Sequence, residues 1–133
     1  MYAVFALAAG ARAAVLDQIR YLALSGDPSE SVKLAREAVE AWQGGRPDEN
    51  LYMARRRLGE ALNFVGRYRE SLEVAEPLSR DIREDPDFGP RHELSIGVAV
   101  QLARLHRTFG RYQEAHELEE FRLSTMDSSP PTR

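Results

Sequence analysis

The three histidines are the first candidates for chemistry, because an imidazole can move a proton or bind a metal ion. They are His92, His106 and His116. His106 and His116 flank a predicted turn, and Glu117 and Glu120 follow them, so one interpretation is a weak metal site. The spacing matches no HExxH motif, and a packed or solvent-facing histidine explains each position more simply. We therefore expect no metal.

No other residue pattern predicts catalysis. The chain has no cysteine, which excludes a thiolate nucleophile, a thiolate zinc site and a disulfide scaffold. It lacks a glycine-rich phosphate loop and a Gly-x-Ser-x-Gly elbow. Its carboxylates are spread over faces that we expect to be exposed, so no acid–base pair can be chosen. We expect a protein with no catalytic residue and no cofactor, and not an enzyme.

Length and composition are those of a single helical domain. The chain has 133 residues, of which 43% are hydrophobic and 29% are charged, so it can form a core without disulfides or metals. Its net charge is −3 and its pI is about 5.7, which argues against a nucleic-acid partner. Arginine supplies all but one of the 18 basic residues, which indicates a GC-rich bacterial genome.

Neither terminus predicts a membrane anchor. The apolar segment 2–9 is far shorter than the about 20 residues of a membrane-spanning helix, and no basic residues precede it as in a signal peptide. We interpret it as the buried start of a first helix, or as an edge that packs on something outside the chain. We expect a cytoplasmic protein that binds no membrane. Residues 127–133 contain a Pro-Pro pair and are predicted to be a disordered tail.

Three seven-residue segments repeat along the chain. They begin at Gly26, Gly66 and Gly110, which lie 40 and 44 residues apart. Each has glycine at the first place, glutamate at the fifth and serine or alanine at the sixth. A nearly constant period of this size indicates stacked structural repeats.

Apolar residues on both sides of each glycine recur every three or four positions, as they do in amphipathic helices. Before Gly66, for example, Leu58, Leu62 and Val65 follow this spacing. Glycine ends helices well because it tolerates a positive φ. Each unit is therefore predicted to be a helix, a tight turn and a second helix. The six predicted helices cover about 3–24, 28–42, 48–65, 67–84, 91–109 and 111–125.

Helix start signals support these boundaries. Asp27 can cap a helix whose first residue is Pro28, and Asp48 marks the next start in the same way. His92 is predicted to lie in a capping turn. Pro77 falls inside the fourth predicted helix, which it is expected to bend because proline has no backbone donor.

The repeated turns resemble the tetratricopeptide repeat (TPR). The residues that carry the resemblance are Leu58-Gly59, Leu62, Gly66, Tyr68, Ser71 and Ala75 in the second unit and Leu102-Ala103, Gly110, Tyr112 and Ala115 in the third. The period exceeds the about 34 residues of an ordinary TPR. It is similar to kinesin-light-chain-like repeats and to the repeats of large actinobacterial signalling ATPases and regulators. HEAT-type repeats have a similar period but lack this turn, and they are the second alternative.

The resemblance implies an all-α, right-handed α-α superhelix of about three hairpins. The repeat domain would cover residues 1–126. Within each hairpin, small residues such as Gly59 and Ser71 would let the helices approach closely, and Tyr68 and Tyr112 would pack beneath their turns. The individual repeats would cover about 11–45, 48–88 and 91–126.

In TPR proteins the first helices of the hairpins line a concave groove that binds a partner. When positions are carried over from the turn glycines, the groove residues are Arg20, Met53, Arg56, Glu60, Asn63, Val100, Arg104 and Arg107. In the first unit, Ala13, Leu16, Ala23 and Leu24 would share this face with Arg20. The set has four arginines and one carboxylate, so an acidic peptide or a C-terminal carboxylate is the expected ligand. The run Arg55, Arg56 and Arg57 points in three directions and is expected to form no compact site.

We therefore predict a protein–protein interaction module that presents a groove to a peptide or a partner protein. The resemblance implies that it is part of a larger bacterial regulator or signalling protein. The alternative is a homo-oligomerisation or spacer module, in which the apolar N-terminal edge with Phe5, Leu7 and Leu24 forms a homodimer.

Overall fold

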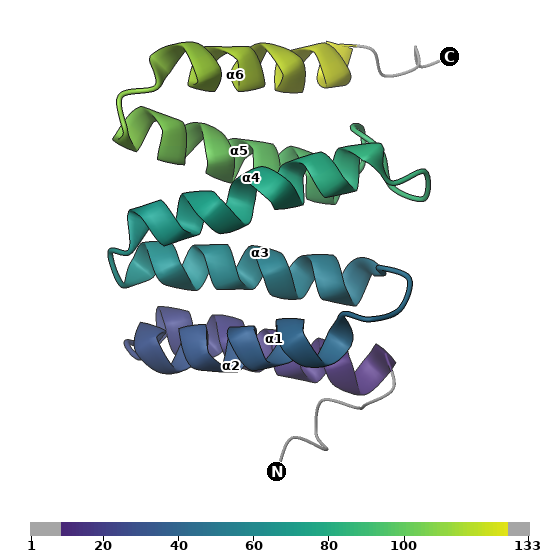
Figure 1. The fold of residues 1–133 in the computed structure, drawn as a ribbon, viewed down its shortest axis with the longest axis vertical. Coiled ribbons are helices and arrows are strands. Elements are labelled where there is room, and N and C mark those ends of the chain that lie inside the picture. The colour runs from purple at the N-terminus through teal and green to yellow at the C-terminus, as the bar shows by residue number, and fades with distance from the viewer. Residues whose placement is uncertain (1–8, 128–133) are drawn as a thin grey trace. The chain divides into compact units, whose positions relative to one another are not determined.

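The computed structural model describes residues 9–127, which form six α-helices (Figure 1). They are α1 (Ala9–Leu24), α2 (Pro28–Trp42), α3 (Glu49–Phe64), α4 (Tyr68–Glu84), α5 (Glu93–Thr108) and α6 (Tyr112–Asp127). Residues 9–127 contain no strand, and the all-α fold class is confirmed. The predicted helix start at residue 3 lies outside the described residues. None of the described helices is both long and apolar enough to cross a membrane.

The C-terminal helix extends one residue into the segment predicted to be disordered. It ends at Asp127. The remaining tail, 128–133, lies outside the described residues, as do Phe5 and Leu7 of the predicted apolar edge.

The three hairpin turns have the same backbone geometry. Gly26, Gly66 and Gly110 have φ values of 102°, 83° and 74°, which favour glycine over any residue with a side chain. The residue after each glycine donates its N–H to the carbonyl five positions earlier, at 2.7–2.9 Å, as in a Schellman motif. Each repeated segment therefore forms the same turn, at the ends of α1, α3 and α5.

The predicted start signals are also confirmed. Asp27 accepts a hydrogen bond from the backbone N–H of Glu30 at 3.3 Å, and Asp48 accepts one from Leu51 at 2.9 Å. His92 is the N-cap of α5, where its Nδ1 accepts from the backbone N–H two residues later. Each cap satisfies a backbone donor that the helix itself leaves unpaired.

Residues 9–74 belong to the first of two compact units, which are described separately below. In this unit α1 packs on α2 and α3, and α2 packs on α3. A serine joins the helices of each hairpin: Ser31 Oγ donates to the carbonyl of Ile19, and Ser71 Oγ to that of Gly59, both at 2.7 Å. The core residues are Leu16, Ile19, Val32, Ala35, Ala38, Trp42, Leu51, Ala54, Leu58, Ala61 and Leu62.

The second unit contains the rest of α4 together with α5 and α6, and α5 packs on α6. The loop before α5 is held by Ser95, whose Oγ donates to the carbonyl of Gly89 at 2.8 Å. Pro77 lies inside α4, as predicted. The buried apolar residues of this unit are Ala75, Leu78, Ile82, Leu94, Val98, Ala99, Leu102, Ala103, Leu105 and Ala115.

The two turn tyrosines do not pack beneath their turns. Tyr68 is 43% exposed and Tyr112 is 68% exposed. Each is the first residue of its helix, directly after the Schellman turn, where its side chain remains in contact with solvent. The prediction for these side chains was wrong.

Candidate functional site

The first candidate surface lies on α3, in the first unit, and two of its arginines converge on one carboxylate. Arg56 Nε lies 3.3 Å from Glu60 Oε2, and Arg57 Nη1 donates to Glu60 Oε1 at 2.9 Å. Arg55 turns away, with its guanidinium 6.0 Å from the ring centre of Tyr52. The three arginines therefore do not form one compact site, as expected, although Arg56 and Arg57 share Glu60.

Burial makes this cluster unusual for a helix surface. The side chains of Arg56 and Arg57 are only 27% and 14% exposed. The Nε atoms of both are buried and make no hydrogen bond in the structure. Arg56 Nε is nevertheless within ion-pair distance of Glu60, and both Nε atoms are shielded from solvent.

Two other predicted residues complete the α3 surface. Met53 is partly buried and packs against the core of the first unit, so it forms the apolar floor of this surface. Asn63 is exposed near the end of α3, and its side-chain amide faces solvent. The α3 surface, defined as Met53, Arg56, Arg57, Glu60 and Asn63, therefore combines an apolar base with donors and one acceptor.

On α1, three residues of the predicted groove face are exposed, Ala13, Arg20 and Leu24, and two are buried. Arg20 is exposed, and no ion pair involving it is found within residues 9–127. Leu16 and Ala23 are buried in the first unit. They lie on the side of α1 that packs against its neighbouring helices, so they are core residues rather than groove residues.

The second candidate surface lies on α5, in the second unit. Val100 is half-buried and Arg104 is exposed, and the described part of the chain gives Arg104 no ion pair. Arg107 is directed toward α6, where its Nη1 lies 3.5 Å from Glu119 Oε2. Glu119 also receives Arg122 Nε at 3.2 Å. Arg107 therefore already forms an ion pair between the two helices of its own hairpin.

Two polar residues that sequence reasoning gave no role are prominent here. Arg57 and Gln101 each lie nine positions before a turn glycine, on α3 and α5 respectively. Both are half-buried, and each has a buried polar atom with no hydrogen-bond partner, Nε and Oε1. The shared spacing from the turn glycine is the sequence signal that could have identified these residues, because it puts a polar side chain at the same position in two repeats.

The lowered pKa of Glu70 marks a structural ion-pair cluster rather than a binding surface. The hydrogen bond from Arg67 is the main cause that lowers the pKa of Glu70 below its ordinary value of 4.5, and Arg36 adds to it. Arg36 Nη2 lies 3.0 Å from Glu70 Oε2. This cluster ties α2 to the turn between α3 and α4.

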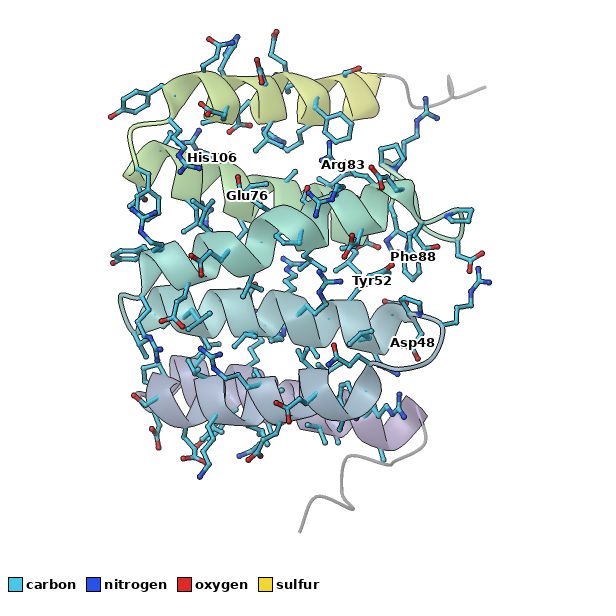
Figure 2. All side chains as sticks on the ribbon, in the orientation of Figure 1. Asp48, Tyr52, Glu76, Arg83, Phe88 and His106 are labelled. Atoms are coloured by element: carbon cyan, nitrogen blue, oxygen red, sulfur yellow. The ribbon has the colours of Figure 1, made fainter. Side chains whose placement is uncertain are left out.

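The histidines lie in separate environments. His106 is buried, and its Nε2 lies 3.8 Å from Glu76 Oε2, toward which it points in Figure 2. Arg111 Nη1 lies 3.8 Å from the same oxygen. His116 is largely exposed beside Glu120, 3.7 Å away. Within residues 9–127 no group of three or more histidine, aspartate and glutamate side chains could hold a metal ion.

The fold is that of known TPR-like structures. The kinesin light chain-like protein of Podosopora anserina, with nearly identical TPR-like repeats, matches with a TM-score of 0.77 and 20% identity over 89% of this chain. A point variant of the same protein matches equally. The TPR domain of Arabidopsis FLU matches with a TM-score of 0.70 and 16% identity, over 89% of this chain and 96% of that domain. The resemblance to TPR proteins is thus confirmed at the level of the fold.

These similarities define the class of structure and no more. This chain spans 56% of the length of the Podosopora protein. No protein-family model matches the sequence, and no curated protein is significantly similar to it. At identities of 16–20% the shared feature is the helical-repeat fold.

Proposed function

We propose that the chain is a protein-interaction scaffold that binds a partner protein or peptide on the first helices of its hairpins. The observation that carries this proposal is the α3 surface, where the partly buried guanidinium groups of Arg56 and Arg57 gather on Glu60. Gln101 lies at the position on α5 that is equivalent to Arg57. Guanidinium groups held in this way can bind a carboxylate through paired hydrogen bonds.

The preferred ligand on this proposal is an acidic peptide. Arginine guanidinium groups bind carboxylates through paired hydrogen bonds, and they are more weakly hydrated than lysine ammonium groups. Arg104 is exposed, and the ion-pair assignments of the described residues do not include it. Arg56 and Arg57 would exchange part of their contact with Glu60 for contact with the incoming carboxylate. The arginine-rich composition favours a bacterial scaffold, which we place in the cytoplasm as part of a larger regulator or signalling protein.

Site-specific photo-crosslinking tests where a partner binds. A photo-reactive amino acid at Asn63 or Arg104, both exposed on first helices, is expected to capture a partner from a lysate. Matched controls are Lys33 and Arg80, which are exposed on the second helices α2 and α4. Capture at the control positions alone would move the interface to the second helices and contradict the proposal.

The charge preference has its own test. Arg104→Glu and Arg56→Glu are expected to weaken capture of the same partner, and wild-type binding is expected to weaken with salt because charge attraction is screened. Circular dichroism must show that the variants fold as the wild type does. Capture that is unchanged in both variants would exclude an acidic ligand. The scaffold proposal itself would then still be decided by the crosslinking result.

A further inference from the structure

Helix α1 has apolar residues on two opposite sides. One side buries Leu16 and Ile19 in the core of the first unit. The other side carries an exposed row at helical spacing, in which Tyr21 is 64% and Leu24 is 62% exposed. We call this row the α1 stripe; it consists of Gly10, Ala13, Ala14, Asp17, Tyr21 and Leu24.

This stripe differs from the exposed face of the neighbouring helix. On α2 the exposed residues include Lys33, Arg36 and Glu40, as expected for a surface in contact with water. A helix that is apolar on both sides is normally covered on both. Large apolar side chains that are exposed next to one another mark an interaction surface. The α1 stripe therefore calls for a partner with an apolar surface of its own.

The order of residues along the stripe makes it complementary to itself. Its N-terminal half is small, with Gly10, Ala13 and Ala14, whereas its C-terminal half carries the large side chains Tyr21 and Leu24. When two copies of such a helix pack antiparallel about a two-fold axis, the large half of each meets the small half of the other. Two-fold interfaces require this kind of self-complementary surface.

The charges of α1 fit the same arrangement. Asp17 lies near the middle of the stripe, and Arg20 lies one turn further along, beside it. Neither has an ion pair within the described residues. With the two-fold axis between Gln18 and Ile19, Asp17 of each copy comes opposite Arg20 of the other, and Leu24 comes opposite Ala13. Two symmetric ion pairs would then flank the axis, and a parallel arrangement would give neither these pairs nor the match in size.

We infer that a second copy of this chain packs antiparallel on the α1 stripe and forms a homodimer. A 16-residue helix is about 24 Å long, so one helix pair buries less than the about 800 Å² per partner of a standard interface. The dimer is therefore weak, and its population depends on concentration.

The inference can be tested with variants in which the charges of Asp17 and Arg20 are reversed. Sedimentation velocity over a wide concentration range measures how strongly each variant dimerises. Asp17→Arg and Arg20→Asp each place like charges in contact and are expected to weaken the dimer by about tenfold or more. The double variant, with both changes, restores opposite charges and is expected to restore dimerisation. Glu40→Arg and Lys33→Asp make the same changes of charge on the exposed face of α2 and are expected to leave the dimer unchanged.

Three results would overturn the inference. They are a wild-type protein that stays monomeric at every concentration, single variants that dimerise as the wild type does, and a double variant that fails to recover. Leu24→Asp provides a check that does not depend on charge exchange, since it places a carboxylate in the apolar contact. All the substituted side chains are exposed, so circular dichroism should show unchanged folding.

Discussion

Replacing Ser71 by alanine removes one hydrogen bond that holds a hairpin together. Ser71 Oγ donates to the carbonyl of Gly59 at 2.7 Å, and the side chain is fully buried. The Gly59 carbonyl keeps its bond within α3, so no buried group is left unpaired. Such a bond contributes about 1 kcal/mol net, whereas alanine gains about 0.5 kcal/mol of helix propensity over serine. The free energy of unfolding should therefore fall by about 0.5 kcal/mol.

A matched control separates the two contributions. Ser124 is exposed on α6, so Ser124→Ala gains the helix propensity without losing a buried hydrogen bond, and stability should rise by about 0.5 kcal/mol. The difference between the two variants, about 1 kcal/mol, measures the Ser71 hydrogen bond. Urea unfolding followed by far-UV circular dichroism gives both values, provided that the slope against urea is unchanged.

The third hairpin allows the reverse experiment. Ala115 is buried and follows Ala103 by the same twelve positions that separate Ser71 from Gly59. In Ala115→Ser the new hydroxyl is expected to donate to the Ala103 carbonyl and to raise stability by about 0.5 kcal/mol net. The reasoning is refuted if Ser71→Ala is as stable as Ser124→Ala and Ala115→Ser loses stability, because the hydroxyl would then contribute nothing in this position.

Three further predictions concern turns, caps and charge. Gly66→Ala should cost about 1 kcal/mol because the residue has a positive φ, whereas Gly45→Ala, where φ is not positive and space is open, should cost much less in the same urea assay. Asp48→Ala removes the cap of α3 and should lower the free energy of unfolding by about 1 kcal/mol, which lowers the melting temperature. Asp48→Asn should retain most of the stabilisation that the cap provides. Because the pKa of Glu70 is lowered on folding, its contribution is present above pH 4.5 and lost as the pH falls below that value. The melting temperatures of wild type and Glu70→Gln should accordingly differ at neutral pH and converge as the pH is lowered below 4.5, and a difference that does not shrink would contradict this account.

The hairpins could be predicted from the sequence because their signals are local. A glycine that ends a helix, an aspartate that begins one and a row of apolar residues between them each act within a few positions. The turns at Gly26, Gly66 and Gly110 and the caps Asp27 and Asp48 are therefore found where they were expected.

The surface features could not be predicted from the sequence, because they depend on contacts between residues that the spacing of apolar positions does not reveal. Arg57 has the residue type of a solvated side chain, yet it is half-buried, because the long stem of an arginine can cover apolar surface. Arg107 could be placed on α5 but not paired with Glu119, since that contact depends on how α5 and α6 align in space. Tyr68 and Tyr112 show the opposite case, in which an aromatic side chain stays exposed at a turn.

The serine bonds and glycine turns also bear on how quickly the chain can fold. Each turn closes through hydrogen bonds between residues five positions apart, and each serine reaches a carbonyl twelve positions away. Contacts this close in sequence require little loop closure before they form, and proteins rich in them fold in microseconds to milliseconds. Any hairpin can therefore serve as the nucleus from which its neighbours order, so a change that weakens one hairpin should speed unfolding without blocking the folding of the others.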